Sequence, residues 1–134
     1  MRRQFQLPQG DEAHLESLGR PWETIIEGGA RWLLSHGWPL PAGYNHPSVS
    51  IAVRIEPGYP DTQLDMVYVF PHLVRKDGMG INNLSNQSID GKNYQRWSRH
   101  RTGENPWRPG IDDLSTHLVL VEDWFAREFF KRAA

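Results

Sequence analysis

Ser98 and His100 stand two residues apart, where a hydroxyl and an imidazole could act together. A serine hydroxyl becomes a nucleophile when a neighbouring base takes its proton, and histidine is the commonest such base. Side chains at positions i and i+2 share one face of an extended chain, but not of a helix. An extended backbone over residues 97–101 therefore predicts a nucleophile–base pair. The alternative is that both are ordinary polar residues on the surface.

Tyr94 and Asn83 are further candidates for chemistry close to this pair. The Tyr94 phenol has an ordinary pKa of about 10, so nearby guanidiniums would have to favour its ionised form. The alternative is a ring packed on a sheet. The Asn83 amide could donate a hydrogen bond to an oxyanion, although asparagine is also common in turns. Ser85 and Ser88 are weaker candidates for the nucleophile, because serine is also a frequent turn residue.

These residues lie in or next to a basic and aromatic stretch, residues 91–109. It has five basic residues and one acidic residue, a net charge of +4, whereas the whole chain has a net charge of −1. Buried guanidiniums need partners, and each could bind a carboxylate through two hydrogen bonds. Those carboxylates could belong to another protein or to this chain, at Asp90, Glu104, Asp112 and Asp113. Each tryptophan of the stretch could simply be a packing residue. The candidate binding residues are Arg96, Trp97, Arg99, Arg101, Trp107 and Arg108.

The amino-acid composition excludes several kinds of site. The chain has no cysteine, which rules out disulfides, thiolate metal sites and thiol nucleophiles. Its six histidines show none of the short spacings of metal ligands, so we expect no metal and no other cofactor. His117 falls within the apolar stripe of a predicted helix, and we expect it to be a partly buried core residue.

Charge and hydropathy bear on partners and location. Aromatic residues interleaved with arginines over 94–108 are one feature of proteins that bind single-stranded nucleic acid. The near-neutral total charge and the lack of a second basic patch argue against that partner. No apolar run is long enough to span a membrane, and the N-terminus has no apolar signal region. We therefore expect a cytoplasmic protein without a membrane partner.

The first half of the chain predicts a small helix followed by strands. Residues 1–9 are predicted to form a flexible arm before a single domain over residues 10–134. A short helix is predicted over residues 11–18, with Gly19 at its end. Strand-forming residues bounded by proline and glycine then predict four strands. These strands, which we expect to form an antiparallel meander, cover residues 21–27, 30–38, 48–56 and 64–70.

The third strand has the clearest pattern and the segment 72–110 the least clear. Apolar residues alternate with polar or small ones over 48–56, which predicts one buried and one wetter face. Residues 72–110 show no long periodic run, so we expect a long irregular segment that carries the site. A segment of this length in a compact domain either is functional or contains short elements that the pattern does not reveal.

A C-terminal helix of about twenty residues is predicted after Gly110. Asp112 and Asp113 at its start and Lys131 and Arg132 at its end would both suit the helix dipole. Apolar residues recur at helical spacing along it, so one stripe should pack on the sheet. The stripe consists of Leu114, Leu118, Val121, Phe125 and Phe129. A meander, an irregular segment and a packed helix indicate an α+β fold.

Several features of the sequence resemble the ubiquitin-conjugating enzyme (UBC) superfamily. The turn Glu56-Pro57-Gly58-Tyr59-Pro60 resembles its Pro-x-x-Tyr-Pro turn. Trp107-Arg108-Pro109 resembles its Trp-Ser-Pro element, which also precedes a helix. Phrases such as PWETIIEGG, WPLPAGYNHPSVS and DDLSTHLVLVEDW resemble the cysteine-poor bacterial branch, prokaryotic family E. The resemblance covers about residues 8–130 and implies a UBC-like fold.

The resemblance also implies a ubiquitin-like conjugation pathway. Genes of the family tend to lie beside those of an adenylating activating enzyme, a ubiquitin-like modifier and a JAB-type metallopeptidase, so these are the expected partners. In the wider superfamily the cysteine of a Gly-Lys-x-Cys element carries the modifier as a thioester. Here the matching residues are Gly91-Lys92-Asn93-Tyr94, with Tyr94 near the place of the cysteine. Asn83 falls near the asparagine of the superfamily's His-Pro-Asn, which is otherwise absent.

Two functions are compatible with this departure. An oxyester on Ser98 or another hydroxyl could replace the thioester, which would make the protein a conjugating-enzyme-like acyl transferase. Alternatively, the protein could be a non-catalytic adaptor of the same fold, which binds the modifier or its activating enzyme.

Overall fold

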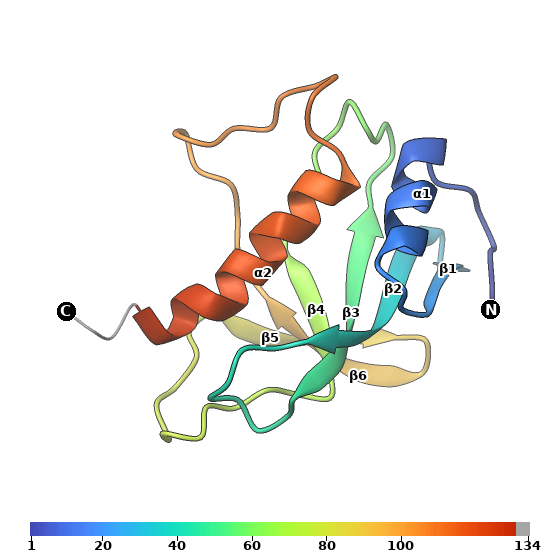
Figure 1. Ribbon diagram of the computed structural model, residues 1–134. Helices are drawn as coiled ribbons and strands as arrows, with labels where there is room; N and C mark the ends of the chain where they lie inside the picture. The colour runs from blue at the N-terminus through green and yellow to red at the C-terminus, as the bar shows by residue number, and fades with distance from the viewer. Residues whose placement is uncertain (131–134) are drawn as a thin grey trace.

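A computed structural model describes residues 1–130, which form two helices and a six-stranded antiparallel sheet. Helix α2 lies across one face of the sheet, and α1 lies beside the first strands (Figure 1). The α+β class predicted from the sequence is confirmed. No helix within these residues has the length and apolar character that a membrane span requires. The elements in chain order are α1 (Gln9–Ser17), β1 (Trp22–Glu27), β2 (Ala30–Pro39), β3 (Ser48–Ile55), β4 (Val67–Phe70), β5 (Leu84–Ile89), β6 (Lys92–Trp97) and α2 (Leu114–Phe130).

The strand order across the sheet is β1-β2-β3-β4-β6-β5. The first four strands form the predicted meander, although β4 begins only at Val67. The prediction of four strands is wrong, because β5 and β6 extend the sheet beyond β4. Part of the segment predicted to be irregular is therefore a β-hairpin, and the first third of the basic stretch is its second strand.

The hairpin forms around Asp90 and Gly91, whose φ angles are 53° and 70°. Two successive residues at positive φ make the tight turn that matches the twist of paired strands, and Asp-Gly is among its preferred sequences. The strand β5 shows no apolar alternation because its central residues are exposed on both faces. The strand β6 buries residues on both faces, so it lacks alternation for the opposite reason.

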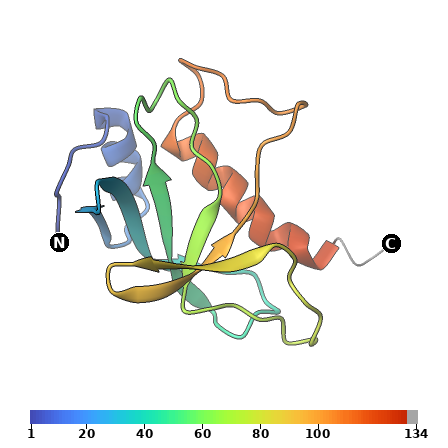
Figure 2. The same ribbon diagram turned by 180° about the vertical axis from the view of Figure 1, so that it is seen from behind.

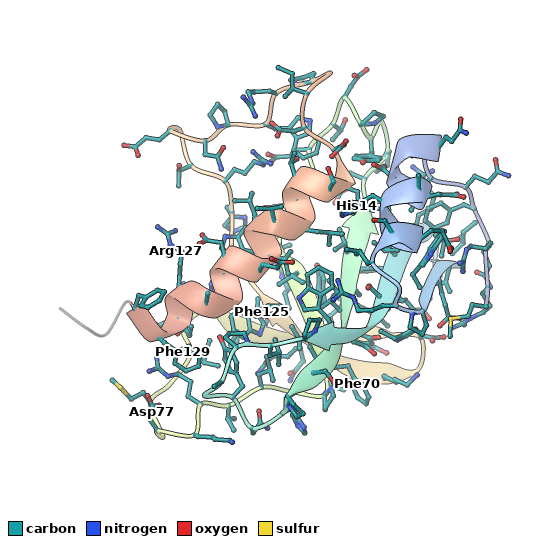
Figure 3. All side chains as sticks on the ribbon, viewed as in Figure 1. His14, Phe70, Asp77, Phe125, Arg127 and Phe129 are labelled. Atoms are coloured by element: carbon teal, nitrogen blue, oxygen red, sulfur yellow. The ribbon has the colours of Figure 1, made fainter. Side chains whose placement is uncertain are left out.

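The helix-side core lies between α2 and the sheet. The alternating residues of β3, such as Ile51 and Val53, meet the predicted apolar stripe of α2 there. Phe125 and Phe129 leave the helix on the same side, whereas Arg127 points away from them (Figure 3). The stripe is thus confirmed, although it also contains the buried polar residues His117 and Glu128.

The start of α2 is stabilised by a reciprocal pair of hydrogen bonds. The Asp113 N–H donates to Thr116 Oγ1 at 3.1 Å, and the Thr116 N–H donates to Asp113 Oδ1 at 3.2 Å. Such an arrangement satisfies donors that have no partner within the first turn. Asp113 therefore caps the helix, as its place in the sequence suggested. Lys131 and Arg132, predicted at the other end, lie outside the described residues.

The opposite face of the sheet encloses a second core, the hairpin-side core. The hairpin β5–β6 lies across the sheet on the side away from α2 (Figure 2). Trp32 and Tyr68 meet edge to face in this core, with ring centroids 5.0 Å apart. Its buried members come from all six strands and are Ile25, Trp32, Leu34, Ala52, Tyr68, Ile89 and Tyr94.

The N-terminal residues lie along the outer edge of β1. The Gln4 N–H donates to the Thr24 carbonyl at 2.9 Å, and the Thr24 N–H donates to the Arg2 carbonyl at 3.1 Å. The Arg2 guanidinium reaches further, to Asp90 in the hairpin turn, at 2.9 and 2.7 Å. The segment predicted as a flexible arm thus joins β1 to the hairpin. Its mobility, like the boundaries of the single domain, stays a prediction.

Candidate functional site

The end of β6 brings three of the four candidate catalytic residues close to one another. The Ser98 N–H donates to the Asn83 carbonyl at 3.1 Å. His100 Nδ1 lies 2.9 Å from a carboxylate oxygen of Asp65, just before β4. The neighbouring Met66 N–H donates to the Arg99 carbonyl at 3.2 Å, which holds these two segments side by side. Asn83, Ser98 and His100 therefore belong to one end of the sheet, as the hypothesis of a shared site requires.

Ser98 occupies a turn, which removes the condition for its predicted pairing. The Arg99 N–H donates to the Trp97 carbonyl at 3.0 Å, a hydrogen bond that closes a three-residue γ-turn around Ser98. Trp97 is the last residue of β6, so the extended strand ends there and the turn at Ser98 follows directly. Within residues 1–130, no hydrogen bond joins the Ser98 hydroxyl to the His100 ring. Ser98 itself is half-buried.

His100 forms an exposed dyad with Asp65. Its side chain is 59% exposed, and Nδ1 lies 2.9 and 3.0 Å from the two oxygens of the Asp65 carboxylate. A carboxylate at Nδ1 holds the proton on that nitrogen in the neutral ring, which leaves Nε2 able to accept another. Sequence reasoning missed Asp65, because 35 residues separate the partners and only the sheet topology joins them.

Tyr94 has the packing role that the sequence left open. Its side chain is 1% exposed in the hairpin-side core, and its ring lies 5.5 Å from that of Phe70. Burial raises the pKa of the Tyr94 phenol to about 12, and the carboxylates of Asp90 and Glu23 add to this effect. The proposed activation by guanidiniums needs the opposite shift. Burial and the raised pKa both favour the packing alternative, and a nucleophilic Tyr94 stays an untested prediction.

Arg99 is held inside the molecule. Its guanidinium donates to the Asn82 carbonyl at 3.0 Å and to Glu128 Oε2 on α2 at 3.4 Å. It also lies over the Trp97 ring, 5.0 Å from the centroid. Trp97 is fully buried and donates its indole N–H to Gln95 at 2.9 Å. Both predicted binding residues thus tie the end of β6 to α2.

Glu128 also organises Arg75, a residue that the sequence analysis did not single out. The Arg75 guanidinium donates to the Glu128 carbonyl at 2.8 Å and forms an ion pair with Asp77 at 2.5 Å. The same guanidinium lies 4.8 Å from the centroid of Phe129. The last turns of α2 are therefore fixed by two arginines that come from different loops.

Asp112 binds two further arginines of the basic stretch. Arg101 approaches it at 3.5 Å and Arg108 at 3.3 Å, and the Arg108 N–H donates to it at 2.8 Å. Burial alone would raise the pKa of Asp112, but these donors and cations hold it below its usual range. The Arg101 guanidinium also lies over the Trp107 ring, at 5.0 Å. Among residues 1–130, Asp112 is thus the one predicted carboxylate that pairs with arginines of the stretch, and Glu128, the partner of Arg99, was not among those predicted.

The two motifs that carry the resemblance contact each other. The Trp107 indole N–H donates to the Pro60 carbonyl at 3.0 Å. Tyr59, in the same turn, donates its hydroxyl proton to Asp11 at 2.5 Å and accepts the Leu114 N–H at 2.7 Å. This turn therefore joins α1, the basic stretch and the start of α2. The residues of both motifs thus have a structural role in holding these segments together.

The remaining candidates differ in exposure. Arg96 is half-buried on β6, opposite Ser85 on β5, and Ser85 and Ser88 are exposed. Arg108 has the most exposed side chain among the predicted binding residues with ion pairs, at 58%. Within residues 1–130, no three histidine or acidic side chains are grouped so that they could hold a metal ion. His117 is fully buried rather than partly, and its ring donates to the Met66 carbonyl at 2.9 Å.

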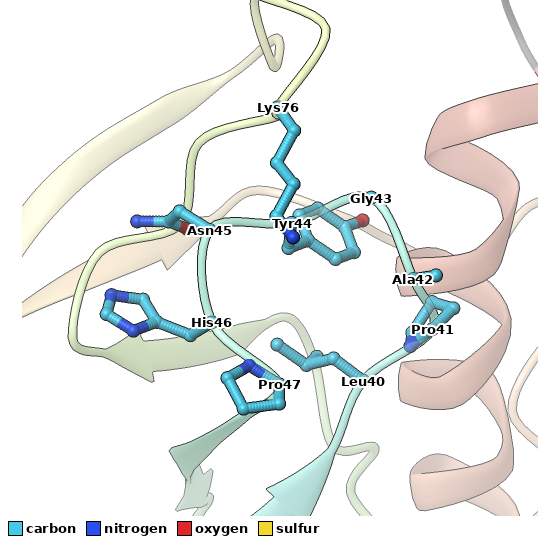
Figure 4. A pocket seen from close by; sticks show the side chains of 9 residues that line it. All are labelled: Leu40, Pro41, Ala42, Gly43, Tyr44, Asn45, His46, Pro47 and Lys76. Atoms are coloured by element: carbon cyan, nitrogen blue, oxygen red, sulfur yellow. The ribbon is translucent and has the colours of Figure 1, made fainter.

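Only some of the exposed candidate residues line a hollow on the protein surface. A hollow of about 440 Å³ is lined by His100, Arg101, Glu104, Asp123 and Arg127, among others, and is open to solvent. Another, of about 450 Å³, is formed by residues 40–47 with Lys76 and contains no predicted site residue (Figure 4). Among the predicted site residues, His100 and Arg101 thus line a hollow that is open to solvent, whereas Asn83 and Arg108 are exposed outside these two hollows.

The comparison with protein families gives one match and covers most of the chain. Residues 7–128 match prokaryotic E2 family E. Neither the curated proteins nor the solved structures that were compared give a significant match. Because the match spans well over half of the sequence, the chain belongs to prokaryotic E2 family E and is a conjugating-enzyme-like protein.

Proposed function

We propose that this protein is a non-catalytic adaptor of a bacterial ubiquitin-like modification pathway, which binds the modifier or its adenylating activating enzyme. Membership of the E2-like family supports interaction with proteins of this kind. The observation that carries the proposal is the γ-turn at Ser98, together with the lack, within residues 1–130, of a hydrogen bond from the Ser98 hydroxyl to a base. A JAB-type metallopeptidase of the same pathway is a further candidate partner.

Acyl transfer needs a nucleophile, a base and an oxyanion donor within reach of one carbonyl group. Tyr94 is enclosed, and three arginines of the basic stretch are engaged with Asp112 and Glu128. These contacts explain the basic stretch as a scaffold rather than as catalytic machinery. What stays exposed is a polar surface around His100 and Arg108, and we propose that partners bind there.

A second candidate, the oxyester, is favoured by the Asp65–His100 dyad. A carboxylate on Nδ1 is the arrangement that prepares a histidine to act as a base through Nε2. Ser98 Oγ would attack the carbonyl of the modifier's thioester on the activating enzyme, and His100 would take the hydroxyl proton. The activating enzyme's thiolate would leave. This route requires the turn at Ser98 to open towards His100.

One experiment separates the two candidates. The protein is incubated with the modifier and activating enzyme of its pathway, with and without ATP. A complex on gel filtration that gives no covalent adduct, and that His100→Ala with Arg108→Ala weakens, is the result expected for the adaptor. An adduct cleaved by hydroxylamine, lost in Ser98→Ala but kept in Ser85→Ala and Tyr94→Phe, would establish the oxyester instead. Neither complex nor adduct would exclude both.

A further inference from the structure

The two outer edges of the sheet differ in what covers them. Residues 2–5 lie along the outer edge of β1 and hydrogen-bond to it. No described segment lies along the outer edge of β5, the last strand on the other side (Figure 2). Charged residues, proline and bulges are the usual protection of such edges, and Leu84–Ile89 has none of them. The strand β5 is thus an open and unprotected edge.

The hairpin turn determines which backbone groups point outward. A two-residue turn at Asp90 and Gly91 makes Ile89 and Lys92 a hydrogen-bonded pair, and such pairs alternate along antiparallel strands. Ser85, Gln87 and Ile89 therefore bond inward to β6, while Leu84, Asn86 and Ser88 direct their N–H and C=O groups outward. Among residues 1–130, only the Gln87 side chain reaches one of these groups, the Ser88 carbonyl, at 3.4 Å.

A mostly apolar hollow of about 390 Å³ adjoins this edge at Leu84, and its two longest polar lining side chains, Arg75 and Gln95, already bond to other groups of this chain. Its other apolar walls include Val74, Met79 and Ile81 from the loop that leads into β5. Val74 is 58% exposed and Met79 is 40% exposed, so apolar surface is available exactly where the outward backbone groups begin. A side chain on a strand paired with β5 would lie next to Leu84 and within reach of this hollow.

We propose that the β5 edge binds an extended peptide segment of another protein, which adds a strand to the sheet and places an apolar side chain in the hollow. Only an extended polypeptide offers alternating donors and acceptors at the spacing of Leu84, Asn86 and Ser88. The hollow selects an apolar residue, and the uncharged edge offers no ion pair to a charged one. The inference concerns a different surface from the one around His100 and does not depend on the adaptor role.

A second copy of this chain fits the edge poorly. In a symmetric antiparallel pair centred on Asn86, Ser88 of the other copy would stand opposite Leu84. A serine does not fill an apolar hollow, and the central residues of β5 are all polar. The occupant is therefore a strand with its own apolar residue.

The test begins with backbone hydrogen exchange of the free protein. The amides of Leu84, Asn86 and Ser88 should exchange faster than those of Ser85, Gln87 and Ile89, because only the second group bonds to β6. A phage-displayed library of random heptapeptides is then selected on the protein, and synthetic copies of the enriched peptides are titrated into it. Enriched peptides should share one apolar position, and their binding should slow exchange at the three outward amides.

Two pairs of variants sharpen the result. Asn86→Pro removes one outward donor without removing a bond to β6, as edge strands tolerate, and should weaken the peptide about fivefold to tenfold. Asn86→Thr keeps the donor and should bind like the unmodified protein. Met79→Ser should weaken peptides with the apolar residue, whereas Lys92→Ser, on β6 and away from the hollow, should not.

Three results would overturn the proposal. One is the absence of any enriched peptide. Another is chemical-shift changes that avoid residues 74–89 when the enriched peptides bind. The third is a concentration-dependent dimer, broken by Asn86→Pro, because it would show that a second copy occupies the edge.

Discussion

The two cores of this protein are closed by the same kinds of charged groups in opposite environments. On the helix side, Arg99 meets Glu128 at 3.4 Å with both side chains nearly inaccessible to water. On the hairpin side, Arg2 meets Asp90 at 2.7 Å, but the Arg2 side chain is 41% exposed. A buried ion left without its partner has no water to replace it, whereas an exposed one does. Removal of one partner should therefore lower the free energy of unfolding much more for the buried ion pair than for the exposed one, although both pairs have similar geometry.

The largest effect is expected on the helix side, from Glu128→Ala. This change leaves the buried guanidinium of Arg99 without its carboxylate, which should lower the free energy of unfolding by about 3–5 kcal/mol. The backbone carbonyl of residue 128, which binds Arg75, remains. Urea denaturation at neutral pH measures the change. Asp123→Ala, which removes the exposed partner of Arg127 on the same helix, is the matched control and should cost less than about 0.5 kcal/mol. Equal losses of unfolding free energy in the two variants would show that burial does not make the Arg99–Glu128 ion pair more important than the exposed one.

His117 should make the helix-side core sensitive to acid. Burial lowers the pKa of His117 from 6.5 to about 4, because the folded protein disfavours the charged ring. The folded pKa lies below the unfolded one, so stability is complete above pH 6.5 and is lost as the pH falls towards 4. The loss attributable to this group is about 3 kcal/mol.

Unfolding free energies measured between pH 7 and pH 4 check this prediction. In His117→Gln the side chain stays neutral at every pH, so its curve should be flatter over this window than that of the unmodified protein. Parallel curves would place the acid sensitivity in other groups.

The predictable parts of the fold are those whose large apolar residues lie on one face. Apolar residues recur every two positions along β3 and about every 3.6 positions along α2. The predicted bounds of both elements lie close to the observed ones. The two hairpin strands show no such periodicity of apolar residues, because most of β5 is exposed on both faces and β6 is buried on both. The dipeptide Asp90-Gly91 was the available signal, since it favours this turn independently of hydropathy.

The candidate site was less predictable than the fold, because its contacts join distant residues. His100 and Asp65 are 35 residues apart, and Arg99 and Glu128 are 29 apart. The sequence indicated that buried guanidiniums need carboxylate partners, but it did not identify which carboxylate binds which arginine. The turn at Ser98 depends on one backbone hydrogen bond, which the residue types in this segment do not predict. Spacing therefore indicated that Ser98 and His100 lie close together, whereas the sheet topology determines which residues they contact.

Tyr59→Phe should have an intermediate effect, because it removes hydrogen bonds on the helix side rather than an ion pair. The change removes the donor to Asp11 at 2.5 Å and the acceptor of the Leu114 N–H at 2.7 Å. Leaving these partly buried groups unpaired should cost about 1–3 kcal/mol. Thermal unfolding measures the loss. Tyr68→Phe is the control, since the Tyr68 hydroxyl makes no hydrogen bond within residues 1–130 and its ring stays packed; a loss as large as that of Tyr59→Phe would contradict the assignment.

The smallest effect is expected from Asp90→Asn, which removes the charge that Arg2 holds on the hairpin side. The pair is partly exposed, so the loss should be about 1 kcal/mol or less and should shrink further at high salt. Asparagine still tolerates the positive φ of this turn, so the hairpin itself should stay intact. Denaturation at low and high ionic strength checks both statements. A loss as large as that of Glu128→Ala, unchanged by salt, would mean that the hairpin closes its core as firmly as α2 closes the other, and the contrast between the two sides would fail.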